Sequence, residues 1–110
     1  MNIERDDIYR VNFDPTIGSE QQGNARPCVI LTQTACNRQL RTAGMVPLTT
    51  SPKALVPLIL PVPSAGKTSS MAPCHQIRTI DKTRIGKLLG ALSAEDATVV
   101  EDGVRRLHSL

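Results

Sequence analysis

Short runs in which apolar and polar residues alternate predict strands in the first half of the chain. Residues Ile8–Phe13 alternate in this way and predict a half-buried strand. Residues Pro27–Thr32 form a continuous apolar run, which is typical of a strand in the middle of a sheet. A third strand is predicted over Ala43–Thr49, and the polar, basic segment Gln33–Thr42 before it is expected to be a loop.

The second half is expected to contain one more long strand, over Met71–Ile80, and then two helices. Asp81 is a candidate N-cap for a short helix over Lys82–Leu89. A C-terminal helix is expected to open at Ser93, and its apolar residues recur at helical spacing, at Ala97, Val100, Val104 and Leu107. Strands first and helices last predict an α+β fold, mainly β, with the helices packed at one end of a strongly bent antiparallel sheet.

Composition narrows the class of protein without identifying it. A chain of 110 residues is long enough for one modest core, so residues 1–110 are predicted to form a single domain. The formal charge of +3 permits nucleic-acid binding but does not demonstrate it. Three cysteines without zinc-ligand spacing predict free thiols, with no metal and no other cofactor. The charged N-terminus and the lack of a long apolar run predict a cytoplasmic protein that does not enter the membrane.

The most specific motif in the chain lies between the first two predicted strands. It reads Asp-Pro-Thr-Ile-Gly-Ser-Glu-Gln from Asp14, passes Gly23, and closes on Arg26 at the rim of the apolar run. A planar guanidinium in that place is well suited to bind phosphate. Together with the segments Pro47–Thr50 and Gln76–Lys82, this motif resembles the MazF/PemK toxins, the ribonuclease halves of bacterial type II toxin–antitoxin pairs.

The resemblance implies a fold, an activity and partners. The fold would be a small SH3-like barrel of the MazF/Kid/CcdB type that pairs into a homodimer. The activity would be ribosome-independent, metal-independent cleavage of single-stranded RNA, chiefly mRNA, at a short sequence, by attack of the 2′-hydroxyl. The partner would be an acidic, MazE-like antitoxin.

The same resemblance implies three catalytic residues. The family's catalytic arginine and threonine fall on Arg26 and Thr49. His75 stands where many relatives have an acid, which in some is considered the general base, and imidazole can perform the same proton transfer. With only one Tyr and one Phe to stack on bases, RNA recognition is expected to use polar side chains instead, at Glu20, Gln21, Thr50, Ser51, Gln76 and Arg78.

The chain departs from the family pattern at several positions. Asp6 stands where the family usually has glycine, and Pro73 stands where some relatives have arginine. Both Asn24 and Ala25 occupy a place that usually holds one residue.

The sequence is also compatible with two other functions. One is a non-catalytic toxin on the same fold, like the gyrase-inhibiting CcdB proteins, which use a tryptophan near the C-terminus that this chain lacks. The other is a barrel that only binds nucleic acid. Incubating the purified protein with RNA in EDTA would separate both from a metal-independent nuclease.

Overall fold

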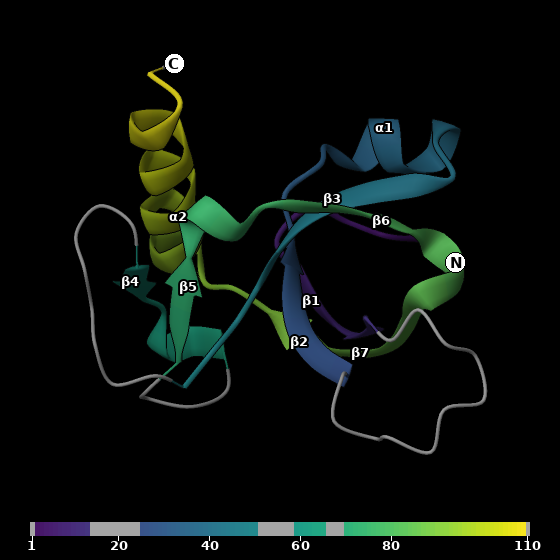
Figure 1. The fold of residues 1–110 in the computed structure, drawn as a ribbon, viewed down its shortest axis with the longest axis horizontal. Coiled ribbons are helices and arrows are strands. Elements are labelled where there is room, and N and C mark those ends of the chain that lie inside the picture. Colours follow the sequence, from purple (N-terminus) through teal and green to yellow (C-terminus); the bar gives the residue numbers. More distant parts are fainter. Residues whose placement is uncertain (1, 14–24, 51–58, 66–69, 110) are drawn as a thin grey trace.

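The computed structural model describes residues 2–13, 25–50, 59–65 and 70–109, and the structural statements below concern these residues. Figure 1 shows a curled antiparallel sheet with a long C-terminal helix to one side of it. The strands are β1 (Asp7–Asn12), β2 (Ala25–Ile30), β3 (Thr42–Pro47), β4 (Ile59–Pro61), β5 (Met71–Pro73), β6 (Arg78–Asp81) and β7 (Ile85–Ala91). The helices are α1 (Thr34–Gln39) and α2 (Ala94–Leu107), and short 3₁₀ turns cover Pro63–Ala65, Cys74–Gln76 and Lys82–Arg84.

β2 is the central strand of a five-stranded sheet whose order is β6-β3-β2-β1-β7. It pairs antiparallel with β1 on one side and with β3 on the other. Cys28, Val29 and Ile30 are 0% exposed because both faces of the strand are covered. The predicted interior strand is therefore confirmed. The mainly β fold class, with a bent antiparallel sheet and a C-terminal helix, is confirmed as well. The edge strands β6 and β7 do not pair with each other, so the described strands do not form a closed barrel.

Two apolar cores fill the two faces of this sheet. On one face, α2 and the β4–β5 pair cover sheet residues such as Val29, and Val100 is among the helix residues that reach them. On the other face the sheet curls around a second core that includes Val11 and Ile30. Ile8 belongs to the first core, whereas Tyr9 and Val11 belong to the second, so the side chains of β1 alternate between the two faces as predicted. Both faces are buried at the start of this strand, where a half-buried strand was predicted.

The segment Gln33–Thr42 is not the plain loop that its polar sequence predicted, because α1 occupies most of it. No side chain caps the N-terminus of α1, and contacts from distant residues hold the helix instead. Buried Asn37 donates from Nδ2 to the carbonyl oxygens of Ile3 (3.1 Å) and Thr32 (3.0 Å), and Lys82 Nζ donates to the Asn37 carbonyl oxygen. Local pattern does not report contacts of this kind, which explains the wrong prediction.

The segment Met71–Ile80 forms two strands where one was predicted. β5 pairs with β4, β6 pairs with β3, and the 3₁₀ turn Cys74–Gln76 separates them. Cys74 turns toward α2, where its Sγ lies 3.9 Å from the carbonyl oxygen of Val100, and a Cβ added to Gly103 would come within 2.9 Å of that sulfur. Close packing against the helix therefore bends the chain at this point.

The helix predicted over Lys82–Leu89 is wrong. Asp81 does act as an N-cap, and its Oδ1 accepts a hydrogen bond from the backbone N–H of Thr83 at 2.9 Å, but the cap serves a single 3₁₀ turn. The chain then continues as β7, which pairs with β1. Pairing with a distant strand overrides the helical spacing of the apolar residues.

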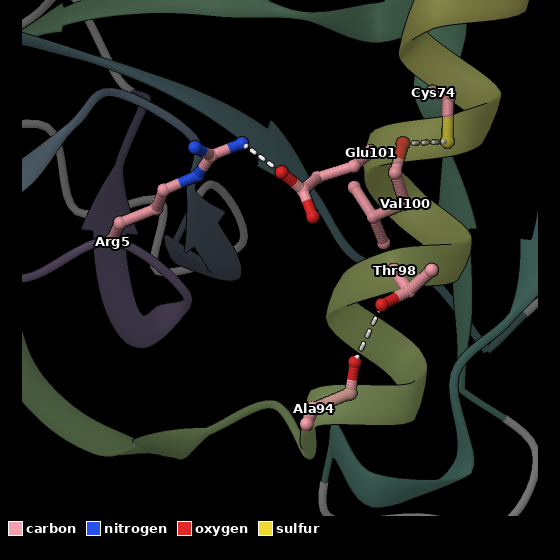
Figure 2. Close-up of polar contacts among 6 residues, drawn as sticks. All are labelled: Arg5, Cys74, Ala94, Thr98, Val100 and Glu101. Carbon is pink, nitrogen blue, oxygen red and sulfur yellow. Dashed lines mark hydrogen bonds and ion pairs between the residues drawn. The ribbon is translucent and has the colours of Figure 1, made fainter.

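α2 is confirmed, with the cap that the sequence predicted. Ser93 Oγ accepts from the backbone N–H of Asp96 at 3.1 Å. The Asp96 carboxylate accepts in turn from the backbone N–H (2.8 Å) and the hydroxyl of Ser64, which fastens the Pro63–Ala65 turn to the start of the helix. Figure 2 shows a second link, in which Arg5 reaches Glu101 on α2 with an N–O distance of 2.7 Å.

Asp6 adopts a backbone conformation that explains the glycine usual at this place in the family. Its φ is 71°, in the left-handed region that glycine enters at no steric cost and that aspartate tolerates better than most residues. Its N–H donates to Ile30 at 2.8 Å, and its carbonyl oxygen accepts from Leu92 at 2.9 Å. The residue thus joins the start of β1 to β2 and to the approach to α2.

Within the described ranges, neither helix is long and apolar enough to cross a membrane.

The Ser93 cap should contribute measurably to stability. We expect Ser93→Ala to lower the free energy of unfolding by about 1 kcal/mol, because the Asp96 N–H loses its acceptor. Thr98→Ala is the matched control, since it also removes a hydroxyl bonded to α2 backbone, at Ala94, but in the helix interior where alanine is favoured. Urea unfolding should show a change of less than about 0.5 kcal/mol for the control. Equal effects of the two substitutions would contradict the capping role.

Candidate active site

A cleft of about 460 Å³ opens beside the first residues of β2. Residues from distant parts of the chain form its walls. They come from β1, β7, the start of β2, the segment after β3, the turn Pro63–Ala65 and the residue before β5. The lining residues are Arg10, Arg26, Pro27, Leu48, Thr49, Thr50, Ala65, Ser70 and Leu89. Two arginines and three hydroxyl groups therefore face one cleft, and the described lining residues include no carboxylate.

Arg26 is positioned by the sheet and by one hydrogen bond. It pairs with Val11 across β1 and β2, and its Nη2 donates to the carbonyl oxygen of Leu48 at 3.3 Å. A guanidinium has five N–H donors, so this bond leaves others for a ligand. The ion pairs among the described residues are Arg5–Glu101 and Arg106–Asp102, and no described carboxylate neutralises Arg26.

Thr49 is fixed by backbone pairing just after β3 ends. Its N–H donates to Met71 at 3.0 Å, and its carbonyl oxygen accepts from the N–H of Met71 at 2.7 Å. These bonds tie the cleft wall to the start of β5. The structure thus brings Arg26 and Thr49 to one cleft, together with Thr50 from the predicted RNA-binding set.

Of the other predicted site residues, those that the structure describes are not among the lining residues of this cleft. His75 and Gln76 are exposed on the 3₁₀ turn beyond the far end of β5, whose near end contacts Thr49. Arg78 begins β6, and its guanidinium lies over the Phe13 ring, 4.6 Å from the centroid. Three further predicted residues lie outside the described residues: Glu20, Gln21 and Ser51.

Sequence reasoning missed Arg10, Ser70 and Leu89 as lining residues of the cleft. Arg10 could have been found from the strand alternation together with the register, because β1 and β2 pair so that Arg10 lies opposite Pro27. The alternation was visible in the sequence, whereas the register was not. Leu89 lies in β7, where the sequence predicts a helix, so its place in the cleft follows from the pairing of β7 with β1.

Cys28 lies close enough to Arg26 and Arg78 to be affected by their charges, but its thiol cannot act as a nucleophile. Burial raises the pKa of its thiol from 9.0 to about 12, and the charges of Arg26 and Arg78 offset only part of this rise. The thiol stays protonated near neutral pH and packs in the core inside the curled sheet. Nowhere in the described ranges do three or more His, Cys, Asp or Glu side chains gather as a metal-ligand set.

The arrangement suits an anion with several oxygen atoms. Guanidinium groups bind phosphate through two parallel hydrogen bonds, and threonine or serine hydroxyls can donate to the remaining oxygens. Leu48 and Leu89 add apolar surface to the cleft wall. We therefore expect a phosphate-containing ligand.

Comparison with known proteins agrees with this chemistry. The family model of PemK-like, MazF-like toxins of type II toxin–antitoxin systems matches residues 4–108. Endoribonuclease PemK of Escherichia coli is 40% identical over 99% of this chain and 82% of its own length, and endoribonuclease toxin ChpB of Escherichia coli strain K12 is 34% identical over 98% and 93%. A mycobacterial endoribonuclease in complex with its cognate antitoxin has a similar fold, with a TM-score of 0.80 and 20% identity over 98% of this chain and 96% of its own.

The raised pKa of Cys28 predicts a loss of stability at alkaline pH. Above the ordinary pKa of 9.0 the unfolded chain releases this proton while the folded chain keeps it, so the free energy of unfolding should fall as the pH rises from 9.0 toward about 12. Cys28→Val removes the thiol at similar volume and should reduce this fall in urea titrations. Cys36→Val, at an exposed thiol, is the control and should leave the fall unchanged. Identical pH profiles for the Cys28 variant and the wild type would refute the assignment.

Proposed function

This chain belongs to the PemK-like, MazF-like toxins of type II toxin–antitoxin systems, and on that premise we propose that it is an endoribonuclease. It would cleave single-stranded RNA at a short sequence without a metal ion, and so inhibit translation and growth. The observation that carries the proposal is that Arg26 and Thr49, the positions of the family's catalytic pair, line one cleft. Relatives that carry the name endoribonuclease support it over a gyrase inhibitor or a simple binding barrel.

The proposed reaction is an internal transesterification. The 2′-oxygen of one nucleotide attacks the adjacent phosphorus, the bond to the 5′-oxygen of the next nucleotide breaks, and a 2′,3′-cyclic phosphate forms. The proton of the 2′-hydroxyl passes to a base, and the departing 5′-oxygen receives a proton. Arg26 would stabilise the negative charge that develops on the phosphate oxygens, and Thr49 would donate to one of them. Electrostatic stabilisation of this kind is usually the largest catalytic contribution.

We assign the proton acceptor to His75, because it occupies the position of the family's acid before Gln76. Its exposed place on the Cys74–Gln76 turn leaves the imidazole accessible to substrate, although the side chain does not line the cleft of the single chain.

Recognition of RNA would use polar groups around the cleft. Unpaired bases present their edges to hydrogen-bonding side chains, whereas a duplex hides them, so a single strand is the proposed substrate. Thr50 lines the cleft and can contact the strand there. The same role is proposed for Glu20, Gln21, Ser51, Gln76 and Arg78 from the sequence.

The proposed partners are a second copy of the chain and an acidic, MazE-like antitoxin in the cytoplasm. The toxin-like relative solved with its cognate antitoxin supports such a partner. The charge of the cleft supports it too, because two arginines without a described carboxylate attract Asp and Glu side chains.

The nuclease proposal predicts cleavage that depends on Arg26. The wild type should cut single-stranded RNA in EDTA and leave duplex RNA intact, while Arg26→Ala should lower kcat by roughly 10²–10³-fold through the loss of transition-state charge stabilisation. Arg38→Ala, at an exposed arginine on α1, is the control and should cut at the wild-type rate. A strict requirement for Mg²⁺, or an Arg26→Ala protein with full activity, would sink the proposal.

The assignment of His75 predicts a distinctive pH profile. If neutral imidazole accepts the proton, cleavage should rise as the pH passes through the range in which imidazole loses its charge. His75→Asp should then keep activity and move the rise to lower pH, whereas His75→Ala should lose roughly 10²–10⁴-fold. Single-turnover rates across pH provide the measurement. A His75→Ala protein with wild-type rate and an unaltered profile would remove His75 from the mechanism.

A further inference from the structure

Arg10 lies in β1 opposite a β-bulge in β7. Tyr9 pairs with Leu88, and Val11 pairs with Ile85, so one residue of β1 faces two residues of β7. Such a bulge re-aims side chains and is common next to functional sites. Gly86 is one of the two residues opposite, and a Cβ there would come within 3.1 Å of the Arg10 carbonyl oxygen.

The bulge therefore places Arg10 in the cleft on a rigid element. Both Arg10 and Leu89 line the β1–β7 wall, and Arg26 lines the neighbouring wall. Arg10 lies opposite Pro27, the residue next to Arg26, and adjacent strands are roughly 5 Å apart. The two arginines thus extend into one cleft from neighbouring strands.

No carboxylate among the described residues forms an ion pair with Arg10. Its side chain is exposed, and the ion pairs found in the described part of the chain involve Arg5 and Arg106 instead. Two like charges that share a cleft repel each other, and an anion between or beside them removes that cost. Arg26 is assigned to the scissile phosphate, and Arg10 lies on the neighbouring strand, where the next phosphate along an RNA strand can reach it.

We propose that Arg10 forms a second phosphate subsite, which binds a phosphate of the RNA strand next to the one that is cleaved. This inference rests on the proposed function, because it takes the ligand of the cleft to be RNA. Arg10 acts as a binding residue that holds the strand in register, while Arg26 acts on the reacting phosphate. Arg10 should therefore contribute to substrate affinity and Arg26 to kcat.

The first experiment measures affinity without cleavage. A short single-stranded RNA with 2′-O-methyl groups lacks the nucleophile, so fluorescence anisotropy reports binding alone. Arg10→Gln should weaken binding about 10-fold or more, as expected for a lost charge-assisted hydrogen bond. The slope of log K against log salt should become shallower by about 0.7, the value for one phosphate contact on a single strand. Arg10→Lys should keep the slope, because the charge remains.

Arg106→Gln is the matched control, since it removes an exposed arginine from α2, outside the cleft. It should change neither the affinity nor the slope. In cleavage assays, Arg10→Gln should raise KM about 10-fold and leave kcat within roughly 3-fold of wild type.

The second experiment locates the phosphate. Neutral methylphosphonate linkages are placed one at a time along the 2′-O-methyl RNA, and one position beside the scissile linkage should weaken binding to the wild type. That same position should have no effect on binding to Arg10→Gln, because the partner charge is already gone.

The outcomes separate the two proposals. A wild type that binds this RNA with the predicted Arg10 dependence but does not cleave RNA would remove the nuclease assignment and leave the subsite. A wild type that cleaves, with an Arg10→Gln protein of unchanged affinity and salt slope, would overturn the subsite alone. Equal methylphosphonate profiles for wild type and Arg10→Gln would overturn it as well.

Discussion

Burial of both faces of β2 is the constraint on which the rest of this structure depends. Cys28, Val29 and Ile30 are fully buried, and their side chains alternate between two cores. Each face needs its own cover, so the sheet curls over one core while α2 and the β4–β5 pair close the other. Removing apolar surface from water supplies the driving force for folding. A strand that is apolar on both faces, such as β2, is therefore typical of the centre of a sheet. Arg26 lies just before the buried residues Cys28–Ile30, and its side chain can therefore reach the cleft at the end of the sheet.

The cleft arises where these covered strands end. Arg26 stands at the start of β2, Thr49 follows β3, and the backbone bonds between Thr49 and Met71 join the sheet to the β4–β5 pair. The far wall is held by polar contacts, since Asp96 at the start of α2 accepts two hydrogen bonds from Ser64, the neighbour of Ala65. Sheet and helix contacts therefore position side chains from distant parts of the chain, as the proposed catalysis requires.

Charge gives the cleft its chemical character. Arg10 and Arg26 share it, and the described lining residues include no carboxylate, whereas elsewhere Arg5 and Arg106 pair with glutamate and aspartate. Arg26 also acts on the core beneath, where its charge and that of Arg78 offset part of the desolvation that raises the pKa of Cys28. A cleft of this charge attracts anions, so one surface can serve both the proposed RNA substrate and the proposed acidic antitoxin.

The sequence alone determined the family, the existence of the interior strand and the Ser93 helix, because each is carried by a local motif or by periodicity. On the same ground it predicted Arg26 and Thr49 as a catalytic pair, and both line the cleft. Only tertiary structure decided the features that depend on contacts between distant segments. Asn37 holds α1 through bonds to Ile3 and Thr32, and pairing with β1 makes Lys82–Leu89 mostly strand. Packing of Cys74 on α2 divides the predicted long strand and leaves His75 outside the cleft that Arg10 joins. Register and packing between distant segments are not encoded in the spacing of neighbouring residues, and they settle which side chains meet.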